Sequence, residues 1–233
     1  MNPQVFGIEH ILYIVISTII GGASIFLGKK FLKTEKAQAV FLKVLAGLLF
    51  VAIASNRLSQ VFRYNMVRWY CIIPDSFCGM TSLVLSLAVL LGKKDNPALH
   101  FVWLLGLFGG ISTVIYAEFV GQSSSIFYLP TISGLLHHSL SAMVVVALLM
   151  FKQIDITYKK WYCTLFGFTC YLTVGAFLMH TFNLSDAFHI AEPLLSGTPL
   201  TAWVMAPMYA AAYAIILFAV EFFKRKKKAK KQP

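Results

Sequence analysis

The chain has 233 residues, of which 58% are hydrophobic and only 12% are charged, and its formal net charge is +11. A soluble protein carries about 25% charged residues, so this composition excludes an ordinary soluble domain and predicts an all-α protein that crosses a membrane several times. The basic residues gather in short loops and in the C-terminal segment "KRKKKAKK", a placement that is typical of membrane topology signals and does not favour nucleic-acid binding.

Seven apolar stretches reach the roughly 20 residues that cross a bilayer as a helix. In chain order they cover residues 8–28, 40–62, 72–92, 99–119, 130–151, 161–181 and 201–223. The first stretch lacks the basic segment of a signal peptide, so we expect it to be retained. Because the connections are short, we expect one bundle of seven transmembrane helices over residues 1–223, followed by a basic tail over residues 224–233.

Lysines alternate between the loops in a way that predicts orientation. They follow the first, third, fifth and seventh stretches, at Lys29, Lys30, Lys33, Lys36, Lys93, Lys94, Lys152, Lys159, Lys160 and in the tail. Basic loops stay in the cytoplasm, so we expect a multi-pass protein of the cell membrane with its N-terminus outside and its C-terminus in the cytoplasm. The tail then faces anionic lipid headgroups, which are its expected partners. The oligomeric state is left open.

In this topology, polar residues gather in the outer halves of the predicted helices, while the inner halves are mostly aliphatic. The candidates for a substrate-binding site are His10, Asn56, Arg57, Gln60, Arg63, Asp75, His180 and Asn183. Ionisable groups within the hydrocarbon are costly and usually face a bundle interior or a wet cavity. Groups at the ends of helices also meet headgroups without any further role, so a functional cavity and simple interhelical hydrogen bonding remain alternatives.

The second stretch places Asn56, Gln60 and Arg63 at i, i+4 and i+7, on one helical face. Arg57 sits beside that face. Such a face could hold a phosphate through charge and forked donors, and the alternative is that both arginines extend to the headgroups.

The third stretch begins with a proline, an aspartate and a cysteine. Pro74 and Asp75 suit the first turn of a helix, which would place Cys78 one turn deeper. A thiol there needs a base to become a nucleophile, and His138 or His137 in the fifth stretch is the candidate at similar depth. No cysteine spacing resembles a zinc site or a redox pair, so we expect neither a metal nor another cofactor.

Four segments together resemble the YwaF-like integral membrane proteins, whose animal relative is a transmembrane acyltransferase acting on ether phospholipids. The segments are "FGIEHILY", "IIPDSFC", "LLHHSLSA" and the region "FNLSDAFHIAEPLLSGTPL" with "MAPMY". The resemblance implies that Cys78 and His138 are catalytic. One departure is Ser76, where that family commonly has histidine or glutamine.

The sequence therefore favours a membrane acyltransferase or lipid-remodelling enzyme that acts on phospholipid acyl esters through Cys78 and a histidine. The alternative is a carrier or binding protein for small solutes without catalytic activity, in which the outer polar cluster would be a vestibule. A thiol oxidoreductase built on Cys71 and Cys78 is disfavoured by their seven-residue spacing.

Overall fold

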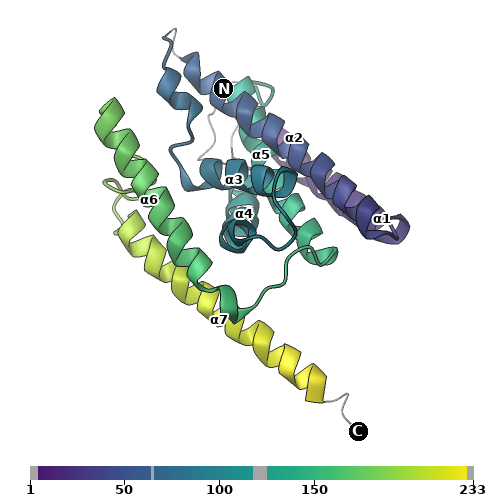
Figure 1. Ribbon diagram of the computed structural model, residues 1–233. Coiled ribbons are helices and arrows are strands. Elements are labelled where there is room, and N and C mark those ends of the chain that lie inside the picture. The colour runs from purple at the N-terminus through teal and green to yellow at the C-terminus, as the bar shows by residue number, and fades with distance from the viewer. Residues whose placement is uncertain (1–4, 64–65, 118–124, 230–233) are drawn as a thin grey trace. The chain divides into compact units, whose positions relative to one another are not determined.

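The computed structural model describes residues 5–63, 66–117 and 125–229, and all the regular structure within these residues is helical (Figure 1). The contacts group the chain into two compact units, Met1–Gln153 and Ile154–Pro233. The predicted all-α class is confirmed for the described residues, whereas the single domain expected over residues 1–223 stays a prediction. The end of the predicted stretch 99–119 and the last four residues of the predicted tail lie outside the described residues.

Seven α-helices follow the order predicted from the sequence. The first unit contains α1 (Ile8–Phe31), α2 (Glu35–Val61), the short 3₁₀ helix η2 (Trp69–Ile72), α3 (Phe77–Leu90), α4 (Pro97–Ile115) and α5 (Leu129–Met150). The second contains η4 (Tyr158–Lys160), α6 (Tyr162–Phe182) and α7 (Ala202–Ala229). Six of the seven, all except α3, are long and apolar enough to cross a membrane. The chain is therefore a multi-pass membrane protein.

Helix α3 is shorter than the predicted stretch of residues 72–92. Its 14 residues extend about 21 Å, against roughly 30 Å for a hydrocarbon core. The helix starts late because Ser76 is its N-cap, where Oγ accepts a hydrogen bond from Gly79 N at 3.3 Å. Pro74 and Asp75 precede this cap, so their predicted place in the first turn is wrong. Cys78 itself lies in that turn, and the count of seven membrane spans stays a prediction.

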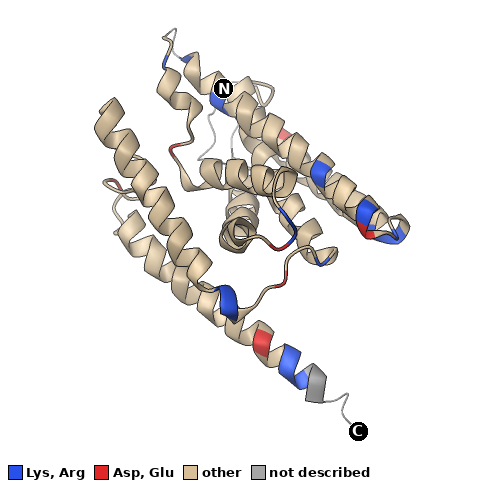
Figure 2. Cartoon of the chain, in the orientation of Figure 1, with Lys and Arg blue, Asp and Glu red and all other residues tan. Residues whose placement is uncertain are grey.

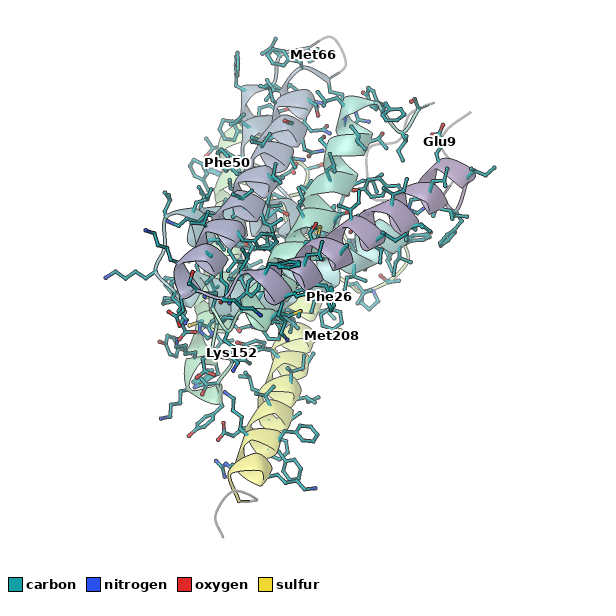
Figure 3. All side chains as sticks on the ribbon, turned by 90° about the vertical axis from the view of Figure 1, so that its right-hand side faces the viewer. Glu9, Phe26, Phe50, Met66, Lys152 and Met208 are labelled. Carbon is teal, nitrogen blue, oxygen red and sulfur yellow. The ribbon has the colours of Figure 1, made fainter. Side chains whose placement is uncertain are left out.

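Helix α5 is the centre of the first unit, because α1, α2, α3 and α4 all pack against it. Figure 3 shows α1 diverging from α2 towards Glu9, with α5 behind the opening between them. Since neighbours surround α5, the adjacent His137 and His138 are both buried.

The second unit is built on α6 and α7, which pack against each other. Phe168 and Tyr209 meet edge to face with ring centroids 5.1 Å apart, and Lys224 Nζ lies 2.7 Å from Asp155 Oδ1. Helix α6 ends at Asn183, whose left-handed backbone (φ 53°) is typical of a helix C-terminus. Helix α7 continues to Ala229, so the predicted tail over residues 224–233 begins as part of a helix.

Helices α4 and α5 approach each other closely at a glycine. A β-carbon on Gly110 would lie 2.6 Å from the carbonyl oxygen of His138 and 3.1 Å from the backbone nitrogen of Ala142. Small residues let membrane helices approach closely, and packing then replaces the hydrophobic effect as the source of stability.

We expect Gly110→Ala to lower the free energy of unfolding by about 1–3 kcal/mol, because the added carbon meets backbone atoms that can move only with the helix. Gly47→Ala in α2 is the matched control, since nothing lies within 4 Å of its added carbon. Thermal unfolding in one detergent measures both. Equal midpoints for the two variants would contradict the close approach.

Candidate functional site

One end of the first unit gathers most of the predicted site. Helices α2 and α4 finish there, and α1, α3 and α5 begin there, as their contacts show: Arg57 meets Asp75, His10 meets Val114 and Asn56 meets Pro130. Four of the polar residues that the sequence placed in the outer halves therefore lie at a common level within this unit: His10, Asn56, Arg57 and Asp75.

Arg57 is held on two sides by side chains of the same end. Its Nη1 donates to Asp75 Oδ1 at 3.0 Å, and its Nη2 and Nε donate to Asn56 Oδ1 at 2.9 and 3.3 Å. Asn56 in turn donates from Nδ2 to the Pro130 carbonyl and to Ser133 Oγ, both at 3.2 Å. This network ties α2 to the beginnings of α3 and α5. Arg57 thus faces polar partners and not the lipid.

Cys78 and His138 meet at a third residue, Gly109 of α4. A β-carbon on Gly109 would lie 3.1 Å from Cys78 Sγ, so the sulfur rests against that glycine. The His138 ring hydrogen-bonds the backbone of Gly109, and the acceptor is the carbonyl because the amide N–H of a mid-helix residue is used within the helix. Cys78 also hydrogen-bonds the side chain of Thr113. Among the described contacts, no direct hydrogen bond joins Cys78 to His138.

His137 makes a separate contact with α3. Its Nδ1 lies 3.1 Å from Ser82 Oγ, one helical turn beyond Cys78. The rings of His137 and His138 lie 4.2 Å apart between centroids, at an interplanar angle of 32°. His137 therefore contacts α3, whereas His138 contacts the α4 glycine that Cys78 touches.

Three other predicted substrate-binding residues contact the protein itself. His10 accepts at Nδ1 from Phe6 N (3.0 Å), and its Nε2 lies 2.9 Å from the Val114 carbonyl. Both ring nitrogens are therefore engaged, and the residue tethers α1 to α4. Gln60 Oε1 accepts from Arg63 Nη1 at 3.3 Å. For these residues a contact with substrate stays a prediction.

Two cavities of about 560 Å³ lie elsewhere. One is formed by α1, α2 and α5 and includes Tyr13 and Ser139, whose hydroxyls are 2.8 Å apart. The α5 residues that line this cavity lie on the other side of α5 from His138, on average about 140° around the helix axis. The other belongs to α6 and α7. Neither of these two cavities is lined by Cys78 or His138.

A model of the TMEM164 family matches residues 5–223, which is nearly the whole chain. The chain belongs to the TMEM164 family. No curated protein and no solved structure matches it. Membership agrees with the multi-pass architecture, because this is a family of transmembrane proteins, and it covers both compact units.

The remaining predicted residues of this TMEM164 family member lie in the second unit. His180 is exposed near the end of α6, and Asn183 is exposed at its C-cap. The left-handed backbone of Asn183 accounts for an asparagine at that position. Within the described residues, no group of three or more metal-ligating side chains occurs, and the expected absence of metal and cofactor stays a prediction.

Four residues of this family member contact the predicted site but were missed in the sequence. They are Ser82, Gly109, Thr113 and Ser133. Ser82 follows Cys78 by four residues, so helical spacing alone could have suggested it. Nothing local marks Gly109 or Thr113, because their role depends on which face of α4 turns towards α3 and α5.

We expect Asn56→Leu to destabilise the protein by about 2–3 kcal/mol. The substitution keeps the side-chain size but leaves the guanidinium of Arg57 and the hydroxyl of Ser133 short of a partner in a buried setting. Asn56 is only 5% exposed. Thermal or denaturant unfolding in detergent measures the effect.

Asp75→Asn is the matched comparison for Asn56→Leu. The Asp75 side chain is 51% exposed, and a half-exposed ion pair contributes less than about 1 kcal/mol. We expect the loss for Asp75→Asn to stay below that value. A larger loss than for Asn56→Leu would show that the ion pair, and not the buried amide, holds this end of the unit.

Proposed function

We propose that the chain is a membrane acyltransferase that uses Cys78 and His138 on the acyl esters of phospholipids. The observation that carries the proposal is that α3 and α5 bring these two side chains to the same residue, Gly109 of α4. A nucleophile and a base on neighbouring helices, with the base oriented by a third group, is the arrangement that cysteine–histidine catalysis needs. The resemblance to YwaF-like proteins and to the ether-phospholipid acyltransferase supports the same residues.

The first half of the reaction transfers the acyl group to the protein. His138 takes the proton from the Cys78 thiol, the sulfur bonds to the carbonyl carbon of the ester, and the carbon–oxygen bond of the ester breaks. The protonated His138 gives its proton to the leaving oxygen, which departs as the alcohol of a lysophospholipid. The Gly109 carbonyl fixes the ring of His138, so one nitrogen is left to exchange the proton.

The second half returns the acyl group to an acceptor. A hydroxyl group of the acceptor lipid gives its proton to His138, its oxygen attacks the thioester carbon, and the carbon–sulfur bond breaks. The proton then returns from His138 to the sulfur. Among the described contacts, no direct hydrogen bond joins Cys78 to His138 in the resting protein. Substrate binding therefore has to draw the two side chains together, and catalytic hydrogen bonds often tighten in this way only in the complex.

His137 and Arg57 have supporting roles in this proposal. Ser82 holds the ring of His137, which packs beside His138 and limits its rotation. A substrate phosphate competes with Asp75 for Nη1 of Arg57, and the half-exposed carboxylate makes this ion pair weak. Asn56 keeps the guanidinium in place during the exchange.

Cys71 is the other thiol near this end of the unit. It lies in η2, before α3, and is a free cysteine. Burial raises the pKa of the Cys71 thiol above its ordinary value, although the positive charge of Arg68 opposes the shift. Its thiol therefore carries less thiolate at neutral pH than an unperturbed cysteine does, and the proposal gives it no catalytic role.

We expect Cys78→Ser and His138→Gln each to abolish acyl transfer while the unfolding midpoint changes little, because both substitutions nearly preserve volume. Incubation of purified protein with a phospholipid that carries a labelled acyl chain, followed by mass spectrometry of the intact protein, detects the thioester. Cys71→Ser is the control and should keep both the thioester and the turnover. Normal turnover by Cys78→Ser protein would disprove the mechanism.

We further propose that the protein lies in the cell membrane with the Cys78 end outside and the C-terminus in the cytoplasm. The basis is the lysine-rich loops, which meet at the opposite end of the first unit from Cys78 (Figure 2). A reporter enzyme that works only in the cytoplasm should be active when it is fused after Lys231. Activity of a reporter that works only outside the cytoplasm, fused at the same place, would reverse the orientation and move the proposed site to the inner side.

A further inference from the structure

A small basic cavity lies at the end of the first unit opposite to Cys78. Its volume is about 150 Å³, and it is lined by Lys43 of α2, by Lys93 and Lys94 after α3, and by Gln153 after α5, together with apolar residues of these elements. Lys43 precedes Arg57 by 14 positions on α2, a distance of about 21 Å along the helix. The cavity is therefore distinct from the proposed catalytic site.

Several polar groups around this cavity have no partner within the described part of the chain. The ammonium groups of Lys43 and Lys93 make no ion pair there, and the side-chain amide of Gln153 makes no hydrogen bond there. Gln153 is 9% exposed as a residue, whereas Lys43 and Lys93 are exposed. Only Lys94 has an acidic neighbour, Glu35 Oε1 at 3.5 Å, which is itself 85% exposed.

The walls of the cavity are held by hydrogen bonds that leave these groups uninvolved. The backbone nitrogen of Asp95 donates to the Gln153 carbonyl at 3.0 Å, which joins the α3–α4 connection to the end of α5. The carboxylate of Asp95 lies 2.7 Å from His100 Nε2, and this aspartate does not line the cavity. The cavity is thus preformed, and no acidic side chain belongs to its lining.

We propose that this cavity binds the phosphate group of an anionic lipid headgroup. Two unpaired ammonium groups, a third lysine and a buried amide donor match the charge and the several acceptor oxygens of a phosphate. A water needs roughly 10–15 Å³ of such space, so the cavity holds a group of phosphate size. Basic pockets between membrane helices on the side of the positive loops are where anionic headgroups bind, and Figure 2 shows several basic residues at this end of the first unit.

The test compares two double variants that lose the same charge. Lys43→Gln/Lys93→Gln removes the two unpaired lysines of the cavity, and Lys29→Gln/Lys33→Gln removes two lysines from the α1–α2 end that do not line it. Native mass spectrometry of the full chain in a neutral detergent, titrated with phosphatidylglycerol, measures the dissociation constant of the first bound lipid.

We expect binding of phosphatidylglycerol to weaken roughly tenfold or more in Lys43→Gln/Lys93→Gln and less than about twofold in the control. Phosphatidylcholine should bind weakly to all three proteins. Equal weakening in the two double variants would overturn the site, because the loss of two positive charges anywhere on the protein would then explain the weaker binding.

Two further measurements separate the site from other causes. Gln153→Leu removes the amide but keeps an apolar side chain of similar size, so we expect several-fold weaker binding with an unchanged unfolding midpoint in the absence of lipid; unchanged binding would contradict the role of the amide. Inorganic phosphate should compete only weakly with phosphatidylglycerol. Full displacement by millimolar phosphate would assign the cavity to the free anion and overturn the lipid as its ligand.

Discussion

The close contact between α4 and α5 is the interaction on which the rest of the first unit depends. At Gly110 the two helices approach until a single added carbon would meet backbone atoms. In a membrane there is no hydrophobic force between helices, so such packing has to supply the stability. The same contact presents Gly109 to α3 and α5 together, and this is why Cys78 and His138 reach one residue although they are 60 positions apart.

The two ends of this unit differ in how their polar side chains are paired. At the Cys78 end, the buried polar groups satisfy one another: Asn56 bonds α2 to α5, Arg57 is shared between Asn56 and Asp75, and His10 joins α1 to α4. At the Lys43 end, the connections are equally well held, but Lys43, Lys93 and Gln153 are left without partners among the described residues. The buried network at the first end is self-sufficient, whereas the lysines at the second end are exposed and are the basis of the headgroup proposal.

Helix α3 lies within the stretch predicted from the sequence but is shorter than that stretch. The apolar run of residues 72–92 marked the helix, but a hydrophobic run does not say where the backbone turns. Ser76 takes the N-cap position of the helix, and Pro74, which is buried, precedes it in the chain. The result is a short helix whose first turn carries Cys78, so the cysteine lies nearer to the end of the helix than the sequence suggested.

Composition and periodicity by themselves determined the all-α class, the order of the seven helices and the gathering of polar residues at alternate helix ends, because each of these follows from local hydrophobicity and from the cost of exposed backbone in lipid. They also drew attention to Cys78, the histidine pair and Arg57. Only the tertiary structure decided which of these side chains meet, since rotation of α4 and α5 about their axes is fixed by packing and not by local sequence. Gly109 and Thr113 acquire a role solely through that rotation, whereas Ser82 follows Cys78 by one helical turn on α3. The basic cavity has the same origin: Lys43, Lys93 and Gln153 are far apart in the chain, and folding alone brings them to one place.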